Sequence, residues 1–318
     1  MKKNYVVGVD IGGQSAKIGL VNKKGEIIER EIISTKQKSS KEFVSLLAKT
    51  IKKMCKEVGL DSINGIGVGA PSSNYYTGEM LNASNVVWGK GKRVKLAEEI
   101  SQKLDNIKVT ITNDANAAAI GEMKYGVAKK MRNFIEITLG TGVGSGIIID
   151  GKLVYGSDGF AGELGHTCAI KNGRDCGCGQ KGCLETYCSA TGVSRTANEM
   201  LSKSKSNSLL RDILKDKKEI TSKDVFDAAE KGDKLAIKIF EFTGEVMGEK
   251  FADFIPFMAP DAIILFGGLA KAQKYFLPSL LKAMNENVVF LWKDKVQVLI
   301  SSLKESDAAI LGASALAW

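Results

Sequence analysis

One pattern of strands and glycine turns occurs twice in the amino-acid sequence, and it constrains the fold more than any other feature. In the first copy, apolar residues predict buried strands over 5–10 and 16–21, with Gly12 and Gly13 in a tight turn between them. A second turn leads to a third predicted strand over 26–33. The three strands are close enough in the sequence to form a series of hairpins.

The second copy starts after a helical stretch. Strands are predicted over 133–139 and 147–150, on either side of a glycine-rich turn at 140–146. A short hairpin turn then precedes a third strand at 153–155. A chain of 318 residues is long enough for two hydrophobic cores. The repeat therefore predicts two related α/β domains that face one another.

Helical and strand patterns alternate through the rest of the chain. Apolar residues recur at helical spacing over 41–59 and through most of 185–250. Further strands and helices are predicted at 63–69, 109–113, 114–119, 262–266, 296–301 and 308–317. We expect a small N-terminal α/β domain over 1–118, a large α/β domain over 119–302, and a helix over 303–318 that returns to the small domain.

The first glycine turn has the composition of a phosphate-binding loop. It contains Asp10, Gly12, Gly13 and Gln14, and consecutive glycines allow backbone N–H groups to converge on an anion. A carboxylate beside such a loop can hold Mg²⁺ through water. An ordinary hairpin, with glycine for backbone reasons only, explains the same residues equally well.

The second glycine turn repeats this arrangement with Gly140, Thr141 and Gly142. Two such loops facing one cleft favour a clamp for the phosphates of a nucleotide over two unrelated turns. Neither loop contains the Gly-Lys-Ser/Thr of a Walker sequence. A dinucleotide-binding fold is also disfavoured, because these turns join strands to strands and do not open helices.

Two further turns follow predicted strands and offer groups to a ligand. Asn113 and Asp114 stand where a strand ends and a helix begins, which is where ligands approach open α/β sheets. A carboxylate there can accept the proton of an alcohol during phosphoryl transfer, or it can merely cap the helix. Gly267 and Gly268 would let an adenine or a ribose approach the backbone, although a plain strand-to-helix turn has the same residues.

The only histidine of the chain, His166, precedes Cys176, Cys178 and Cys183. One imidazole nitrogen and three thiolates make a complete tetrahedral zinc set, and a closed set of four is normally structural. The cysteines are interleaved with glycine and lysine, unlike a packed core, and structural disulfides are rare in the cytosol. The spacing therefore favours zinc over buried free thiols or a disulfide.

The residues around this set suggest a wider role for the metal loop. Glu163 and Glu185 flank the set on either side. We therefore expect the metal to shape a loop that presents two acids and an imidazole to another molecule. Cys55, Cys168 and Cys188 are predicted to lie outside the set, with Cys168 as the best substitute ligand.

Composition excludes several classes of protein. The hydrophobic content of 44% and the charged content of 25% are ordinary for a globular protein. No apolar run reaches the roughly 18 to 20 residues that a membrane span needs, and the N-terminus lacks the apolar region of a signal peptide. We expect a cytoplasmic protein with no membrane partner. The net charge of +9 comes mainly from dispersed lysines, with only six arginines, so we do not expect nucleic acid as a partner.

Seven segments of the chain, in the same order, resemble the ROK family of bacterial sugar kinases and sugar-responsive repressors. The segments are Asp10–Gly13, Gly69–Pro71, Asn113–Ala118, Leu139–Gly144, Gly162–His166, Cys176–Glu185 and Gly267–Gly268. The resemblance covers essentially the whole chain, and the cysteine segment is its most specific part. It implies a two-domain, actin-like ATPase (ribonuclease H-like) fold, with a central cleft that closes on a sugar and ATP and a zinc-bearing loop.

The resemblance also implies roles for the site residues. Asp114 matches the catalytic base that takes a proton from the sugar hydroxyl. The residues that hold the other hydroxyls match Asn113, Glu163, His166 and Glu185, and His166 also matches a zinc ligand beside Cys176, Cys178 and Cys183. Together with the glycine turns, the resemblance places the nucleotide at Asp10, Gly12, Gly13, Gln14, Gly140, Thr141, Gly142, Gly267 and Gly268.

Two departures from the family pattern affect the interpretation. Gln14 stands where the family usually has threonine, and the segment 72–78 differs from the commonest form beside the sugar pocket. We interpret the chain as an ATP-dependent glucokinase that transfers phosphate to the 6-hydroxyl of the hexose. Mg²⁺ would accompany ATP, Zn²⁺ would be structural, and the protein would be a homodimer or a higher homo-oligomer.

Three alternatives remain open at this point. The same site would serve a kinase for an N-acylhexosamine, fructose or a β-glucoside. Polyphosphate could replace ATP as the phosphate donor. The third alternative is a sugar-responsive transcriptional regulator. Family repressors carry a helix-turn-helix domain ahead of the first glycine loop. Asp10 is only ten residues from the start of the sequence, so we do not expect that domain.

Overall fold

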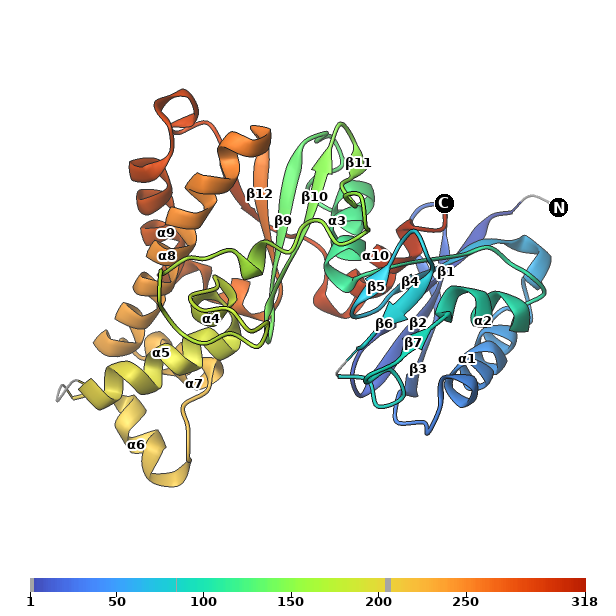
Figure 1. Cartoon of the computed structure of the whole chain (residues 1–318), viewed down its shortest axis with the longest axis horizontal. Coiled ribbons are helices and arrows are strands. Elements are labelled where there is room, and N and C mark those ends of the chain that lie inside the picture. The colour runs from blue at the N-terminus through green and yellow to red at the C-terminus, as the bar shows by residue number, and fades with distance from the viewer. Residues whose placement is uncertain (1–2, 84, 204–206) are drawn as a thin grey trace. The chain divides into compact units, whose positions relative to one another are not determined.

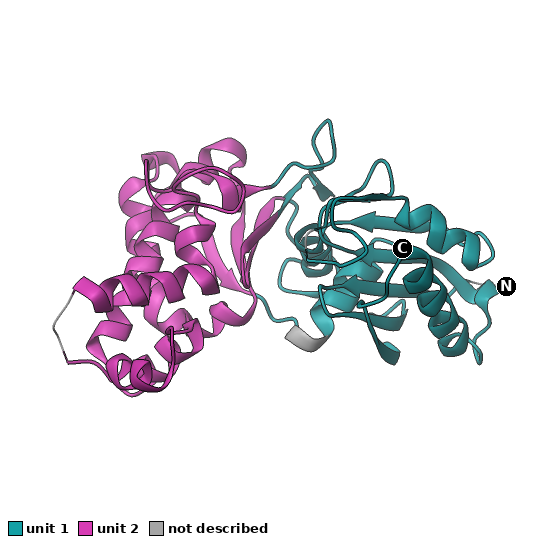
Figure 2. Ribbon diagram, turned by 60° about the horizontal axis from the view of Figure 1, so that its bottom comes forward, with its two compact units in different colours: residues 1–132, 146–162, 301–318 teal, residues 133–145, 163–300 magenta. Residues whose placement is uncertain are grey.

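The computed structural model of the chain describes residues 3–83, 85–203 and 207–318, which form two compact units (Figure 1, Figure 2). Unit 1 contains Met1–Arg132, Gly146–Gly162 and Ser301–Trp318, and unit 2 contains Asn133–Ser145 and Glu163–Ile300. Among the described residues, no helix combines the length and the apolar character needed to cross a membrane.

Unit 1 is built on a five-stranded sheet with the strand order β3-β2-β1-β4-β8. Its strands are β1 (Tyr5–Ile11), β2 (Ser15–Asn22), β3 (Ile27–Ser34), β4 (Ile63–Gly69) and β8 (Val109–Thr112). The first three strands pair antiparallel, and β4 and β8 add to β1 in parallel. The series of hairpins predicted at the N-terminus is therefore confirmed.

Helices cover both faces of this sheet. The helices α1 (Ser40–Met54) and α2 (Leu96–Lys103) bury apolar residues with Val7 and Val9 of β1 on one face. The helix α10 (Glu305–Ala315) packs on the other face beside α3 (Asp114–Tyr125) (Figure 1). Three short strands form a separate small sheet: β5 (Ser73–Asn74), β6 (Glu79–Leu81) and β7 (Arg93–Val94).

A row of glycines lets α10 approach the sheet closely. Gly8 pairs with Gly19 of β2 and with Gly67 of β4, so the three lie side by side on one face. A Cβ atom on Gly67 would lie 1.9 Å from the carbonyl oxygen of Ala313 in α10. Only glycine fits this contact, and the C-terminal segment is thereby packed against the N-terminal sheet.

The helix predicted over 41–59 is shorter than expected. The Ser39 side chain caps its start by accepting a hydrogen bond from the backbone N–H of Glu42. It ends at Met54, and Cys55 is its C-cap. Gly59 has a φ of 76°, which a continuing helix does not allow, so the apolar periodicity extends beyond the helix itself.

A second five-stranded sheet has the order β11-β10-β9-β12-β13. Its strands are β9 (Phe134–Leu139), β10 (Val143–Ile149), β11 (Lys152–Leu153), β12 (Ala262–Phe266) and β13 (Gln297–Ile300). β10 pairs antiparallel with β11, and β12 pairs in parallel with β9 and β13. The order repeats that of the first sheet, with three consecutive strands followed by two later ones, as the repeated sequence pattern predicted.

The core of unit 2 lies between β9, β12 and a set of helices. The helices are α4 (Glu185–Cys188), α5 (Ala190–Lys203), α6 (Leu209–Asp216), α7 (Ser222–Glu230), α8 (Lys234–Met258) and α9 (Gln273–Asn287). Ile135, Ile263 and Phe251 are buried in this core. Gly248 brings α8 against α9, because a Cβ atom there would lie 2.3 Å from the carbonyl oxygen of Leu280.

The two units differ from the domain limits expected at residues 118 and 302. Unit 1 continues to Arg132 and also includes 146–162, so β10 starts in unit 2 and ends in unit 1. Close packing explains this difference. A Cβ atom on Gly146 would lie 2.5 Å from the Cβ of Ala119 in α3, so this part of β10 lies directly on the helix of unit 1.

Candidate functional site

The first glycine turn, Gly12 to Gln14, joins β1 to β2 in unit 1. The N–H of Gly12 donates to the carbonyl of Ser15 at 2.9 Å, which closes the turn. Thr35 supports the turn through two hydrogen bonds. Its hydroxyl donates to the carbonyl of Gly12 at 3.0 Å, and its N–H donates to the carbonyl of Gln14 at 3.1 Å. The Gln14 side chain is exposed. The turn is thus fixed by backbone contacts, and its outer surface is open.

Asp10 lies just before this turn, at the end of β1. The pKa of its carboxyl is raised to about 6, mainly by burial and also by the nearby charge of Asp114, while the charge of Lys17 acts to lower it. A carboxylate that is desolvated and close to a second carboxylate binds a proton or a cation readily. The pair Asp10 and Asp114 can therefore hold a divalent cation beside the turn, directly or through water.

Asn113 and Asp114 lie where β8 ends and α3 begins, as predicted. The side-chain oxygen of Asn113 accepts a hydrogen bond from the N–H of Asn116 at 2.7 Å, so Asn113 caps the helix. Asp114 is the first residue of α3, and its side chain is exposed. One of its oxygens accepts from the N–H of Ala115 at 2.9 Å. Because Asn113 provides the cap, the carboxylate of Asp114 remains available to a ligand.

The second glycine turn, Gly140 to Gly142, joins β9 to β10 in unit 2. The N–H of Gly140 donates to the carbonyl of Gly142 at 3.0 Å. The start of α5 supports the turn, because Ala190 N–H donates to the Gly140 carbonyl at 2.9 Å and the Thr191 hydroxyl to the Thr141 carbonyl at 2.8 Å. Both glycine turns are therefore closed by a backbone hydrogen bond and held from outside.

The third turn, at Gly267 and Gly268, lies against the same part of unit 2. Gly267 has a φ of 109°, and a Cβ atom there would lie 2.6 Å from the carbonyl oxygen of Leu139. Leu139 directly precedes the second glycine turn. The structure therefore brings the predicted adenosine turn close to the predicted phosphate turn of unit 2.

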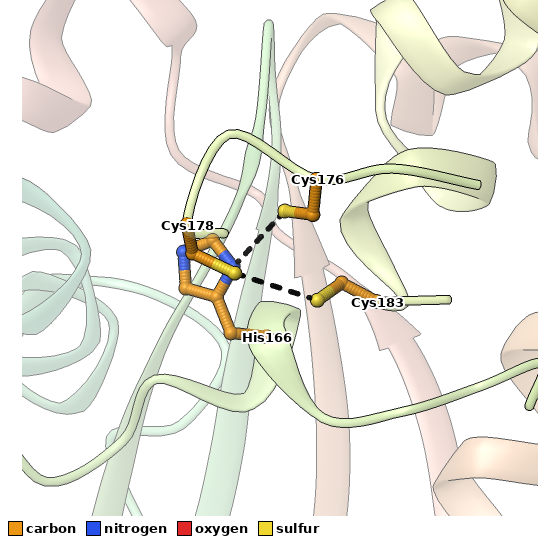
Figure 3. Close-up of side chains that lie close together, drawn as sticks. All are labelled: His166, Cys176, Cys178 and Cys183. Carbon is orange, nitrogen blue, oxygen red and sulfur yellow. Dashed lines mark hydrogen bonds between the residues drawn. The ribbon is translucent and has the colours of Figure 1, made fainter. Parts of the chain in front are cut away.

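Four side chains of unit 2 converge as the sequence predicted (Figure 3). One ligand atom from each of His166, Cys176, Cys178 and Cys183 lies within 4.8 Å of the others. The Sγ atoms of Cys178 and Cys183 are 3.6 Å apart, and the Sγ of Cys176 is 3.6 Å from Nδ1 of His166. A tetrahedral zinc ion would need sulfur–sulfur and sulfur–nitrogen distances of about 3.8 and about 3.5 Å. The donor set and these two distances fit such an ion.

The other cysteines are not members of this group, although the backbone of Cys168 pairs with that of Cys183. Cys55 and Cys188 are buried, and Cys168 is exposed. All six cysteines are in the described part of the chain, and all are free thiols. The Cys178–Cys183 separation of 3.6 Å is also too long for a sulfur–sulfur bond. The structure therefore contradicts the disulfide alternative for this segment.

Val143 connects the metal-ligand group to the second glycine turn. The carboxylate of Glu185 accepts a hydrogen bond from the N–H of Val143 at 2.9 Å, and its other oxygen is 4.0 Å from the Sγ of Cys176. Gly165, just before His166, packs so closely that a Cβ atom would lie 2.1 Å from the Val143 carbonyl oxygen. Glu163 is exposed and starts the turn that contains His166.

The predicted site residues thus fall into two groups. Unit 1 contains Asp10, Gly12, Gly13, Gln14, Asn113 and Asp114, and unit 2 contains all the others. In unit 1 the arrangement can bind a cation and accept a proton. In unit 2 it can hold a metal ion and present an imidazole nitrogen with two carboxylates. His166 directs Nδ1 toward Cys176, so Nε2 is left for another partner.

Two supporting residues were not found from the sequence. Thr35 is fully buried behind the first turn, and the indole N–H of Trp88 donates to its carbonyl at 3.1 Å. Arg174 lies in the metal loop, and its guanidinium donates to the carbonyl of Thr186 at 2.7 Å and to Glu199 at 2.7 Å. A buried threonine has no sequence signature. An arginine among glycines and cysteines could have been noticed as the cation of a buried pair.

Comparisons with known proteins agree with this arrangement. A family model described as the ROK family matches residues 6–318. A glucokinase of Halalkalibacterium halodurans is 33% identical over 318 residues, which cover 98% of this chain and 94% of that protein. A xylose repressor of Caldicellulosiruptor bescii is 30% identical over 315 residues, which cover 98% of this chain and 77% of the repressor.

A solved structure extends the likeness to the fold. It is a ROK family glucokinase from Streptomyces griseus in complex with glucose and AMPPNP, with a TM-score of 0.78 and 29% identity. The match covers 98% of each chain. The family model spans nearly the whole sequence, and a relative above 30% identity covers it as well. The chain therefore belongs to the ROK family, and its fold is the α/β, actin-like ATPase fold of ROK sugar kinases.

Proposed function

We propose that the protein is an ATP-dependent hexose kinase and that its substrate is glucose, phosphorylated on the 6-hydroxyl. The support comes from the glucokinase relative and from the glucose and AMPPNP bound to the ROK glucokinase of Streptomyces griseus. In the proposed reaction, the sugar oxygen forms a bond to the γ-phosphorus, the bond to ADP breaks, and the hydroxyl proton goes to Asp114.

The exposed carboxylate of Asp114 is the observation that carries this proposal. A general base needs a carboxylate oxygen that a ligand can reach, and the cap of helix α3 is supplied by Asn113 instead. Asp114 is also close enough to Asp10 to raise its pKa, so the proposed base and the proposed cation ligand share one site in unit 1. Mg²⁺ held beside Asp10 would neutralise the developing charge on the phosphates.

The remaining site residues take the other proposed roles. Asn113, Glu163, His166 and Glu185 would hold sugar hydroxyls, because each presents an amide, imidazole or carboxylate group. The nucleotide would contact Gly12, Gly13, Gln14, Gly140, Thr141, Gly142, Gly267 and Gly268. Closure of a central cleft, a homo-oligomeric state and a cytoplasmic location stay predictions.

We also propose that the ion held by His166, Cys176, Cys178 and Cys183 is structural zinc. The support is the donor set of one imidazole and three thiols, together with two distances between ligand atoms, both 3.6 Å, that are close to those around a tetrahedral ion. The set has four protein ligands and leaves no open position, so the ion would supply no reacting group. Its chemistry would be to fix the ring of His166 and the start of α4.

A coupled assay with a panel of sugars tests the proposed function. The panel contains glucose, N-acetylglucosamine, fructose and a β-glucoside, each with ATP and with polyphosphate as donor. We expect glucose and ATP to give the highest kcat/KM. Asp114→Asn should lower kcat by at least about 10²-fold, the low end for a general base, and should keep sugar binding. Asp61→Asn, a change of an exposed acid elsewhere in unit 1, should leave kcat unchanged.

The xylose repressor relative favours one second candidate, a sugar-responsive regulator without kinase activity. It predicts that the protein binds a sugar but phosphorylates none of the panel with either donor. It further predicts a sequence-specific DNA footprint that sugar changes. A kinase with no DNA function would instead show only weak DNA retention that moderate salt abolishes.

A further inference from the structure

Two of the metal ligands, Cys176 and Cys178, lie on a tight hairpin of the metal loop (Figure 3). At the base of this hairpin, which we call the metal hairpin, the N–H of Gly182 donates to the carbonyl of Arg174 at 2.7 Å. Nearer the tip, the N–H of Cys176 donates to the carbonyl of Gln180 at 2.9 Å. These bonds hold the two sides of the hairpin together, so its attachment to the rest of unit 2 depends on the residues at its base.

The side chain of Arg174 attaches this base to two helices. It is buried, with 7% of its surface exposed. Its Nη1 donates to the carbonyl of Thr186 in α4 at 2.7 Å and to that of Gly192 in α5 at 3.3 Å. Its Nη2 donates to the hydroxyl of Thr196 at 2.9 Å and to the carboxylate of Glu199 at 2.7 Å, and Nε donates to the same carboxylate at 3.1 Å. All three guanidinium nitrogens therefore donate to α4 or α5.

Tyr187 of α4 contacts both the backbone and the side chain of Arg174. Its hydroxyl accepts the backbone N–H of Arg174 at 2.9 Å, and the guanidinium carbon lies 4.4 Å from the centroid of its ring. A Cβ atom on Gly173 would lie 2.2 Å from the same hydroxyl oxygen. Glycine before Arg174 thus lets the buried tyrosine approach the base of the metal hairpin closely.

The other two ligands are tied to α4 through the backbone. Cys183 lies two residues before the start of this helix. The N–H of Leu184 donates to the carbonyl of Thr167 at 2.9 Å, and Thr167 directly follows His166. The position of the metal hairpin relative to α4 therefore decides whether all four donors meet.

We propose that Arg174 is a positioning residue of the metal site. It holds the metal hairpin against α4, and it thereby brings two of the four ligands to the other two before a metal ion binds. Arg174 is not a ligand itself and acts through the backbone of the hairpin. The inference rests on the structural metal ion proposed above, and it does not depend on the proposed kinase activity.

The physical reason is the cost of ordering the ligands. Donors on a mobile loop lose conformational freedom when they bind an ion, and that loss lowers the affinity. A buried guanidinium resists displacement, because moving it would leave its N–H groups without acceptors. Groups that orient metal ligands without touching the ion typically change the metal affinity about 10- to 100-fold when they are removed.

Arg174→Lys tests the role with metal binding to the full chain. Lysine keeps the charge but lacks the planar fork that reaches both helices. We expect its dissociation constants for Co²⁺ and Zn²⁺ to be at least about 10-fold above those of the wild type. The visible absorption of Co²⁺ bound by thiolates reports the geometry of the site, and it should lose intensity in this variant. Arg211→Lys is the matched control, since Arg211 lies in α6 and donates to the carbonyl of Leu201, and it should bind both ions as the wild type does.

Hydrogen exchange in the metal-free full chain separates positioning from a general loss of stability. In Arg174→Lys, the amides of Cys176 and Gly182 should exchange at least about 5-fold faster, because the base of the hairpin opens more often. The amides of β9 and β12 should keep their wild-type rates. Faster exchange in these strands to the same extent would show that Arg174 supports the whole unit and would overturn the positioning role.

A second variant decides the point even if Arg174→Lys does not fold. Tyr187→Phe removes only the hydroxyl that accepts from the backbone of Arg174, and it should raise both dissociation constants about 5-fold. Tyr275→Phe is its control, because this hydroxyl donates to Glu230 elsewhere in unit 2. Variants at Arg174 and Tyr187 that bind both ions as tightly as their controls would refute the inference. A wild type that binds neither ion would instead refute the proposed metal site. Neither measurement needs a sugar or ATP, so the result stands whatever the activity of the protein.

Discussion

The carboxylate of Glu185 accepts a hydrogen bond from the backbone N–H of Val143 at a distance of 2.9 Å. Glu185 opens the helix that follows the metal loop, and Val143 is the first residue after the second glycine turn. A residue predicted to bind the sugar is thereby tied to a turn predicted to bind phosphate. A substitution that displaces either Glu185 or the glycine turn should therefore displace the other.

Gly142 offers the sharpest test of this connection. A Cβ atom there would lie 2.3 Å from the carboxylate of Glu185, whereas nothing lies within 4 Å of a Cβ atom on Gly140. Gly142→Ala should displace Glu185 and weaken sugar binding at least about 10-fold, the effect of losing one or two good hydrogen bonds. Gly140→Ala should keep the sugar affinity and the melting temperature of the wild type. Equal sugar affinities in the two variants, measured by calorimetry, would show that Glu185 does not depend on the turn.

Removal of the proposed metal should affect sugar binding as well as stability. Elemental analysis should find about one zinc per chain, because one closed site needs one ion. Cys178→Ser should lose the zinc and most of the sugar affinity together, since the same loop carries His166 and leads to Glu185. Cys168→Ser changes an exposed cysteine outside the group and should retain both. Full zinc occupancy in Cys178→Ser would contradict the ligand set.

The parts of the site that lie close together in the sequence could be predicted well. His166 and its three cysteines fall within 18 residues, so their spacing alone predicts one cluster. Hairpin strands joined by glycine turns are also local, and the repeated pattern predicts two similar sheets. Asn113 and Asp114 follow a strand that the apolar pattern makes clear.

The supporting contacts could not be predicted, because they join distant segments through groups without a distinctive pattern. Thr35 meets the turn at Gly12 across 23 residues, and Trp88 meets Thr35 across 53. A similar contact accompanies the extension of unit 1 past the domain limit expected at residue 118. The packing of Gly146 on Ala119 is a tertiary contact between small residues, which leave no periodic signal in the sequence.

Asp10 should make stability depend on pH. Its carboxyl has a pKa of about 6 in the folded chain against an ordinary value of 3.8, so the folded state binds more protons than the unfolded state between these values. Stability therefore falls as the pH rises from about 4 to about 6, and the cost is fully present above that. Asp10→Asn should raise the free energy of unfolding by on the order of 2 kcal/mol at pH 7.5.

The pH dependence of the stabilisation distinguishes removal of the buried Asp10 charge from a stabilisation that has another cause. The gain from Asp10→Asn should shrink as the pH is lowered toward 4.5, and Mg²⁺ should stabilise the wild type more than the variant at pH 7.5. Asp61→Asn, at an exposed position, is the control, and its effect on the free energy of unfolding should not vary with pH. Denaturant unfolding at pH 7.5 and at pH 4.5 measures the effects of Asp10→Asn, of Asp61→Asn and of Mg²⁺ on the free energy of unfolding. A gain from Asp10→Asn that is equal at both pH values would rule out the burial of an ionised Asp10.

Thr35 should act on nucleotide binding through the first glycine turn. Its hydroxyl donates to the carbonyl of Gly12 at 3.0 Å, and Trp88 holds the carbonyl of Thr35 from the other side. Thr35→Val removes this donor without changing the shape of the side chain. We expect the KM for ATP to rise about 5-fold, because a backbone turn that must present N–H groups to phosphate loses a support worth about 1 kcal/mol. The KM for the sugar should not change, and Thr35→Ser, which keeps the hydroxyl, should restore the wild-type KM for ATP.

Thr50→Val is the matched control, since it removes a buried hydroxyl that donates to the carbonyl of Leu46 within α1, away from the turn. If the two valine variants change the KM for ATP equally, the turn does not depend on Thr35 and the effect is one of stability alone.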